Sequence, residues 1–390
     1  MRPGRDVVVT GAGAVSAFGW DTAAFWSGLL AGGGGFTPIT RFTPTSPGMR
    51  AATVPPFEVR TLVRTPVGRR MDWVSLMTLG ACRAALADAA LEPGTLIGER
   101  TGIGFGSAYG NLQETETFLD RLFERGSGTP LLFPNLVFNA PLSYVSIELG
   151  ITGETAMFSM LEASSETAIG WGAALVADGR AEVCLAGGVD EVGRVPHRLL
   201  ADAGRLASAS PRPFDRGADG FGLGEGAGVL VLEGADQARA RGARVRARVT
   251  ASAAFAVPAP VHGWAHDAAA LAAGLEPLVH DADVVFAAAS GDPALDRLEA
   301  AALAAAAPGV TVTAVRGAIG DFGGAGALAA IAAVKTLETG TVPPTVGLRP
   351  PARAGLDVVC GGPRRRPVRA AAVVGLARGG ACRVLRLETP

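Results

Sequence analysis

One stretch in the middle of the chain decides its fold, and it reads Arg212-Pro213-Phe214-Asp215-Arg216, then Asp219-Gly220-Phe221-Gly222-Leu223-Gly224-Glu225-Gly226-Ala227-Gly228. The closely spaced glycines suit tight turns and close backbone approach, and the apolar run after them predicts a strand over residues 227–233. The stretch lacks the Gly-Lys-Ser/Thr ending of a phosphate-binding P-loop. Near the N-terminus, Ser16 stands where a dinucleotide fingerprint would need its third glycine. We therefore predict structural turns at both places and no nucleotide site.

Outside this stretch, short β-branched runs alternate with Ala- and Leu-rich segments along the whole chain. This alternation is typical of parallel strands covered by helices on both faces, so we predict the α/β class. The predicted strands are 6–10, 101–105, 182–186, 227–233, 283–289, 310–315 and 370–376. The predicted helices are 21–31, 73–89, 113–124, 140–149, 163–178, 265–279, 295–306 and 323–338. Because the second half repeats the order of the first, we predict a duplicated fold with halves 1–233 and 234–390.

The composition excludes several classes of function. The chain has 390 residues, is 48% hydrophobic and carries a net charge of −1, so it has no basic footprint for nucleic acid. The apolar stretches are interrupted too often for a membrane span. Its four cysteines show no CxxC spacing, which argues against a zinc site or a disulfide framework and favours the reducing cytoplasm. These residues are Cys82, Cys184, Cys360 and Cys382.

Several segments taken together resemble the β-ketoacyl synthase family. Besides the stretch at 212–233, the segments that carry the resemblance are Val7-Val8-Val9-Thr10-Gly11-Ala12-Gly13-Ala14-Val15-Ser16, Arg69-Arg70-Met71-Asp72, Asn139-Ala140-Pro141 and Gly187-Gly188-Val189-Asp190. The resemblance covers essentially the whole chain. It implies a thiolase-like α/β fold, in which duplicated halves form a five-layered αβαβα sandwich.

The resemblance also implies where a condensing enzyme would carry its cysteine nucleophile and two histidines. Glu162 takes the cysteine position, Ala289 stands where the first histidine is expected, and Asp321 replaces the second. Arg316 takes the place of a lysine before that histidine, and Arg378 lies in the C-terminal turn where a Phe-rich gate is expected. We therefore predict no catalytic residue, no metal and no condensation by this chain alone.

A family member without its cysteine implies a chain-length factor, the non-catalytic subunit of a type II polyketide synthase. Such a subunit pairs with an active ketosynthase, with the strand at about 155–159 meeting its counterpart across the interface. Together they form the tunnel that controls polyketide chain length during decarboxylative condensation. The implied partners are the ketosynthase and an acyl carrier protein, whose phosphopantetheine holds the substrates. No other cofactor, no nucleic acid, no membrane and a cytoplasmic location are expected.

By resemblance, the tunnel lies against a helix that begins near residue 110. Side chains one turn apart on one face of this helix would set the length of the tunnel. These candidates are Asn111, Glu114 or Thr115, and Phe118. An ordinary surface helix is the alternative interpretation, since Glu114 and Glu116 are charged.

Two other functions remain open from the sequence. Glu162 could serve a malonyl-carrier decarboxylase or priming factor, although a carboxylate at a helix start is also stabilised by the N-terminal amides in a structural role. Alternatively, the chain could form a homodimer that binds an acyl carrier protein without chemistry. Basic residues could receive an acidic carrier protein or could form a solvated face. They are Arg60, Arg64, Arg69, Arg70 and Arg364 to Arg366.

Overall fold

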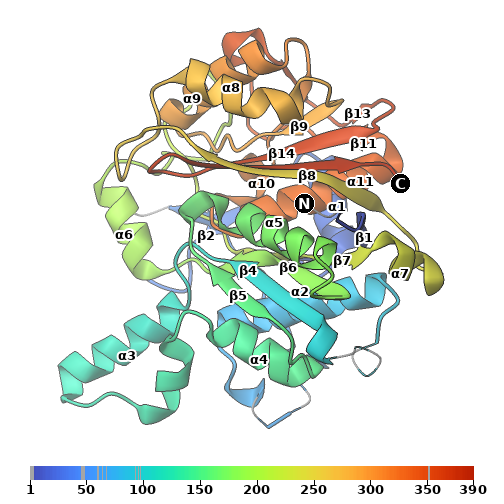
Figure 1. Cartoon of the computed structure of the whole chain (residues 1–390). Helices are drawn as coiled ribbons and strands as arrows, with labels where there is room; N and C mark the ends of the chain where they lie inside the picture. The colour runs from blue at the N-terminus through green and yellow to red at the C-terminus, as the bar shows by residue number, and fades with distance from the viewer. Residues whose placement is uncertain are drawn as a thin grey trace.

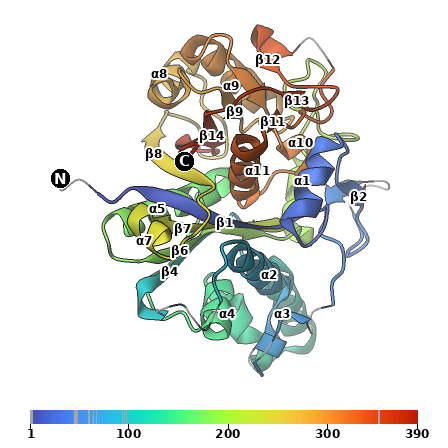
Figure 2. The ribbon, with the colours of Figure 1, turned by 90° about the vertical axis from the view of Figure 1, so that its right-hand side faces the viewer.

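A computed structural model describes residues 4–44, 49–58, 61–63, 65–66, 68–92, 94, 96, 98–349 and 352–390. Helices and sheets alternate in layers, with α8 and α9 at one end of the stack and α2 and α4 at the other (Figures 1 and 2). The helices are α1 (Thr22–Leu30), α2 (Trp73–Asp88), α3 (Leu112–Arg125), α4 (Ala140–Leu149), α5 (Ser164–Ala177), α6 (Arg194–Asp202), α7 (Ala235–Ala240), α8 (Ala268–Val279), α9 (Pro293–Ala306), α10 (Arg316–Ile319) and α11 (Ala325–Thr339).

The main strands form a continuous sheet in the order β12-β10-β9-β14-β15-β8-β1-β7-β6-β4-β5. These strands are β1 (Val7–Val15), β4 (Thr101–Gly106), β5 (Thr155–Phe158), β6 (Val183–Asp190), β7 (Gly226–Gly234), β8 (Ala247–Ala256), β9 (Val284–Phe286), β10 (Thr311–Thr313), β12 (Asp357–Val358), β14 (Ala370–Leu376) and β15 (Ala381–Glu388). Two small pairs stand apart, formed by β2 (Phe36–Pro38) with β3 (Arg50–Ala52) and by β11 (Thr341–Val342) with β13 (Arg364–Arg365).

One arrangement of strands occurs twice in this order. In the first part, β5, β4 and β6 run parallel, and β7 and β1 follow antiparallel. In the second part, β12, β10, β9 and β14 run parallel, and β15 and β8 follow antiparallel. The first residues of β1 also pair with β8 and so join the two parts. The predicted α/β class and the duplicated five-layered fold are thus confirmed, while the division at residue 233 stays a prediction.

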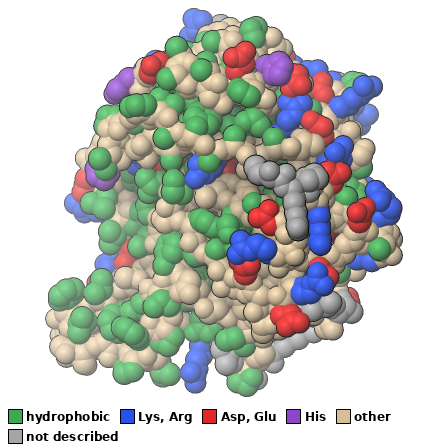
Figure 3. Space-filling view, viewed as in Figure 1, with side chains coloured by type: hydrophobic (Ala, Val, Ile, Leu, Met, Phe, Trp, Pro, Cys, Tyr) green, Lys and Arg blue, Asp and Glu red, His purple; other side chains and the backbone are tan. Residues whose placement is uncertain are grey.

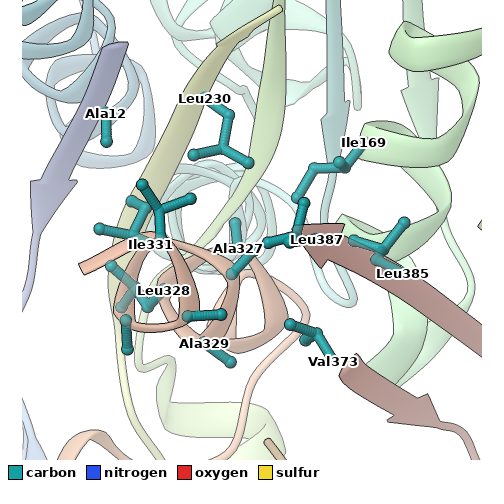
Figure 4. Packing of buried hydrophobic residues seen from close by; sticks show 14 of the residues in the cluster. Ala12, Ile169, Leu230, Ala327, Leu328, Ala329, Ile331, Val373, Leu385 and Leu387 are labelled. Carbon is teal, nitrogen blue, oxygen red and sulfur yellow. The ribbon is translucent and has the colours of Figure 1, made fainter. Parts of the chain in front are cut away.

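The central layer contains α5 and α11, which lie between the two parts of the sheet (Figure 2). Nearly every residue of α11 is buried, because its alanines allow both parts of the sheet to approach it closely. Its Leu328 and Ile331 pack into a core that also contains Leu230 from β7 and Leu385 from β15 (Figure 4). This tight centre fixes the N-terminal turns of α5 and α11, where the candidate site lies.

All the predicted helices are present, and α4 has the predicted bounds. The predicted strands are also present, although those at 283–289 and 310–315 shorten to Val284–Phe286 and Thr311–Thr313. Strand β15 was not predicted. Nor was β8, which is rich in Ala and has a weak intrinsic strand signal. Its pairing with β15 and β1 holds it extended. Within the described residues, no helix is both long enough and apolar enough to cross a bilayer.

Candidate functional site

The sharp turn before α5 is the centre of the candidate site. Glu162 lies in a short 3-10 turn, η6 (Leu161–Ala163), which leads directly into α5. Leu161 adopts a left-handed backbone with φ of 49°, which costs a non-glycine residue about 1–2 kcal/mol. The hydroxyl of Ser164 donates to the Leu161 carbonyl at 2.6 Å and accepts from the Met160 amide at 2.9 Å. The turn that leads into α5 is therefore sharp and strained, and it carries Glu162.

Arg378 forms an ion pair with the carboxylate of Glu162. The Glu162 residue is only 6% exposed. Its Oε1 accepts from Nε of Arg378 at 2.7 Å and lies 2.5 Å from a terminal guanidinium nitrogen, and its Oε2 accepts from the Arg378 amide at 3.1 Å. Burial alone would lower the pKa of Arg378, but Glu162 and Tyr109 raise it overall. Both oxygens of the carboxylate are consequently engaged by one residue from the turn after β14.

Arg316 connects the three positions where catalytic residues were expected. One guanidinium nitrogen donates to the Glu162 carbonyl at 3.1 Å, and another donates to the Ala288 carbonyl at 2.6 Å. Its Nε lies 3.2 Å from Oδ1 of Asp321. Ala289, the next residue after Ala288, is fully buried beside this contact. The structure thus brings together all three positions identified by resemblance, around a buried arginine.

Two further carboxyl groups surround Arg316. Glu166 is fully buried in the first turn of α5, and its carboxylate lies 3.7 Å from the Arg316 guanidinium. Glu299 on α9 accepts from the Ala288 amide at 2.8 Å, while its other oxygen has no hydrogen-bond partner. Burial raises the pKa of Glu166 and of Asp321, and raises that of Glu299 to about 8. The site therefore contains more carboxyl groups than cations and favours the protonated form of some of them.

This arrangement suits electrostatic packing better than acyl transfer. The contacts described above around Glu162, Arg316 and Arg378 include no thiol and no imidazole, so they supply no nucleophile for thioester exchange.

Tyr109 also borders the site. Its hydroxyl lies 3.4 Å from a guanidinium nitrogen of Arg378, and burial raises the pKa of its phenol to about 12. Among the described residues, no group of three or more His, Cys, Asp or Glu side chains is placed to hold a metal ion.

The candidate tunnel residues lie on α3 and its N-cap, and α3 starts six residues after the end of β4. Asn111 is buried at the start of the helix, and its amide donates to the Asp72 carboxylate. The hydroxyl of Thr115 donates to the Asn111 carbonyl at 2.8 Å. Glu114 has one buried oxygen without a hydrogen-bond partner, and burial and the nearby Asp72 raise its pKa. The first turn of α3 is thus polar and is held against the start of α2.

Further along, α3 leaves the layered body and forms an arm with the 3-10 helix η5, Pro130–Leu136 (Figure 1). Phe118 packs against Phe133 of η5, with their ring centroids 6.2 Å apart. None of the α3 residues is buried. The exposed apolar side chains of the arm are Leu119 (40%), Leu122 (37%), Phe123 (81%), Leu131 (65%) and Phe133 (61%). Hydrophobic side chains accordingly cover much of the arm in Figure 3.

Three members of the site, Tyr109, Glu166 and Glu299, were not predicted from the sequence. Tyr109 gave no signal, because its contact with Arg378 joins residues far apart in the chain. Glu166 did offer one, since it is a charged residue in an otherwise apolar helix. Of the proposed basic docking residues, Arg60 and Arg64 lie outside the described residues. Arg364 is paired with Asp357, and Arg366 with Asp283, so carrier docking there stays a prediction.

The fold and this site define a thiolase-like protein with buried ion pairs at the positions where, by resemblance, a condensing enzyme is expected to carry its cysteine and histidines. The sequence model of the Beta-ketoacyl synthase N-terminal domain matches residues 4–238, and that of the C-terminal domain matches residues 247–349. The chain therefore belongs to the β-ketoacyl synthase family.

Individual relatives agree with this assignment. A 3-oxoacyl-[acyl-carrier-protein] synthase 2 from Coxiella burnetii is 30% identical over 229 residues, which cover 56% of this chain and 55% of that one. The chain thus spans about half the length of the curated relatives it matches.

Two solved structures are similar over the whole chain. One, described as the ishigamide ketosynthase/chain length factor, has a TM-score of 0.91 and 28% identity, covering 99% of this chain and 100% of that one. A β-ketoacyl synthase from Burkholderia phymatum STM815 has a TM-score of 0.90 and 26% identity at the same coverage.

Proposed function

We propose that this chain is the chain-length factor of a type II polyketide synthase. It pairs with an active ketosynthase and lines the tunnel into which the polyketide grows during decarboxylative condensation. The substrates arrive on the phosphopantetheine of an acyl carrier protein in the cytoplasm, and the chain itself contributes no cofactor.

The observation that carries this proposal is the ion pairing at the former active site. Glu162 is held by Arg378, and Asp321 by Arg316, in a buried region where a ketosynthase needs a free thiolate and two imidazoles. A site of this kind retains the shape of the fold and removes its condensing chemistry. The similarity to a solved ketosynthase/chain length factor along almost the full chain supports the same role.

Decarboxylation by Glu162 is the weaker alternative. A carboxylate acting as a base or as an electrostatic group toward malonyl thioester would need an oxygen directed at the substrate. Both Glu162 oxygens instead accept hydrogen bonds from Arg378. Releasing them would leave a buried charge without its partner, which is strongly unfavourable.

Two surfaces favour a partner of the same fold. Strand β5 is the last strand of the sheet and pairs only with β4 among the described strands, so its outer edge presents backbone groups to another strand. The arm of α3 and η5 exposes large apolar side chains beyond the layered body, as expected of a surface that a partner covers. Residues 155–159, which were predicted to meet the partner, include the whole of β5.

Co-expression with ketosynthase candidates from the same genome tests the proposal. Native mass spectrometry should show a one-to-one heterodimer, and the heterodimer should elongate malonyl units only when this chain is present. Replacing the partner's nucleophilic cysteine should abolish elongation, whereas Glu162→Gln should leave it active. A stable homodimer that ignores every ketosynthase would contradict the proposal, and carbon dioxide release lost only in Glu162→Gln would favour the decarboxylase.

A further inference from the structure

The former nucleophile turn is in direct contact with the loop that precedes α3. Gly106, the last residue of β4, lies so close to the start of α5 that an added Cβ would meet the Ser164 backbone at 2.1 Å. The hydroxyl of Ser164 also lies 3.2 Å from the Ser107 carbonyl oxygen. The start of α5 and the loop at 107–110 therefore pack as one unit.

A second connection runs through side chains. Arg378 holds the Glu162 carboxylate with its Nε and one terminal nitrogen. The same terminal nitrogen lies 3.4 Å from the Tyr109 hydroxyl. Tyr109 stands two residues before Asn111, where α3 starts. The order of contacts is thus Glu162, Arg378, Tyr109 and then the candidate tunnel helix.

The backbone of the same loop is fixed from the opposite side by Asp190 at the end of β6. This fully buried carboxylate accepts from the amides of Ala108 and Tyr109 at 3.0 Å each, and from the Gly323 amide at 2.7 Å. The Ser107 hydroxyl donates to it as well. With the backbone held in this way, the direction in which Tyr109 points depends on what its side chain contacts.

We propose that Glu162 and Arg378 are positioning residues that hold Tyr109 and, through it, the first turn of α3. The position that carries the nucleophile in a ketosynthase would then help to set the tunnel in this subunit. The effect on the tunnel rests on the chain-length function proposed above, whereas the contact between the site and α3 is a property of this chain alone.

An ion pair can hold Tyr109 in one position better than apolar side chains packed into the same space could. A buried salt bridge often contributes no more stability than well-packed apolar residues of similar volume, but its directional hydrogen bonds fix a geometry. Arginine also presents several donors in one rigid plane, so it can bind a carboxylate and a hydroxyl together. Lysine has a single ammonium group and would keep the charge pair without the planar fork that reaches Tyr109.

Four variants in the heterodimer test the proposal. Glu162→Gln with Arg378→Met removes both charges at once and avoids an unpaired buried carboxylate. Tyr109→Phe deletes only the hydroxyl, and Arg378→Lys keeps the charge pair. Arg383→Met is the matched control, because Arg383 also contacts α5, by donating to the Thr167 hydroxyl at 3.0 Å, but makes no described contact with the loop at 107–110.

Hydrogen exchange and product length are the two measurements. The double variant and Tyr109→Phe should speed exchange at amides 107–118 by about tenfold and broaden the distribution of product lengths, with the amount of heterodimer unchanged. Arg378→Lys should retain the thermal stability of the wild type but not its product length. Arg383→Met should change neither hydrogen exchange nor product length.

Unchanged exchange in the double variant would overturn the proposed contact. Faster exchange with an unchanged product distribution in an active complex would overturn its role in the tunnel. A wild-type heterodimer that makes no elongated product would instead contradict the chain-length function, and the exchange measurement would still decide whether Glu162 and Arg378 hold the loop.

Discussion

The side chains of the candidate site and those of the α3 arm find their partners in opposite ways. At the site, Glu162, Arg316 and Asp321 are buried and paired within the chain. In the arm, Phe123 and Phe133 are largely exposed, and no residue of α3 is buried. The difference teaches that the charged interior of this chain is paired within the fold, while the arm leaves large apolar side chains exposed. Variants of the two regions should accordingly affect different properties.

The largest expected effect comes from separating the ion pair at the site. Arg378→Met leaves Glu162 buried without its cation and should lower the free energy of unfolding by about 3–5 kcal/mol. The combination of Glu162→Gln with Arg378→Met removes both charges and should recover most of that loss. Chemical denaturation of the two variants measures this difference. Equal destabilisation of the single and the double variant would show that the pair contributes through packing alone.

A pH dependence should also distinguish the buried site from the exposed arm. Burial raises the pKa of Glu299 to about 8, so the folded state holds this proton more tightly than the unfolded chain does. Its contribution to stability is fully present below the unfolded pKa of about 4.3 and is lost as the pH rises toward 8, at up to about 1.4 kcal/mol per pH unit.

Unfolding curves between pH 5 and 8 test this direction. Stability should fall with rising pH, and Glu299→Gln should make the decline shallower, although Glu166 and Asp321 have pKa values raised by burial as well. Glu124→Gln on α3 is the control in the arm and should leave the decline unchanged. An identical slope in wild type and in Glu299→Gln would refute the prediction.

The arm should affect assembly and not folding. Phe123→Asp changes a side chain that is 81% exposed, so the free energy of unfolding should change by less than about 0.5 kcal/mol. If the partner covers this side chain, its loss should weaken the heterodimer about thirtyfold, as truncation of an aromatic interface anchor does. Val261→Asp is the control, because Val261 is 76% exposed but lies in the loop between β8 and α8. Equal dissociation constants for the two variants would exclude the arm from the interface.

The smallest expected effect is that of restoring the nucleophile alone. Glu162→Cys returns a thiol to the strained turn, but Ala289 and Asp321 still stand where histidines are expected and Arg378 has lost its partner. We expect no condensation above background when the partner ketosynthase carries an inactivated cysteine. Measurable elongation by this variant would show that the remaining site supports catalysis.

The sequence was sufficient for the fold, because the fold depends on local motifs, whereas the assignment of Glu162, Ala289 and Asp321 to the positions of catalytic residues stays a prediction. The glycine-rich stretch before β7 and the turn before α5 are short patterns that can be identified without knowing their neighbours. The contact from Arg378 to Tyr109 could not be predicted, since it depends on how a C-terminal turn packs against a loop 269 residues earlier. The sequence left open whether α3 lines a tunnel or lies on the surface, because an amphipathic pattern has the same spacing whether its apolar face meets the core or a partner.

The position of β1 has a consequence for how the chain is made. Its residues Val7–Val15 lie between β7 and β8, whose residues emerge from the ribosome about 200 positions later. At a translation rate of about 5–20 residues per second, the apolar first strand stays unpaired for about 10–40 s before either neighbour has been synthesised. During that time it is available to chaperones or to other nascent chains. Translating this chain close to the ketosynthase partner proposed above would therefore affect the yield of correctly paired complexes before any folded interface exists.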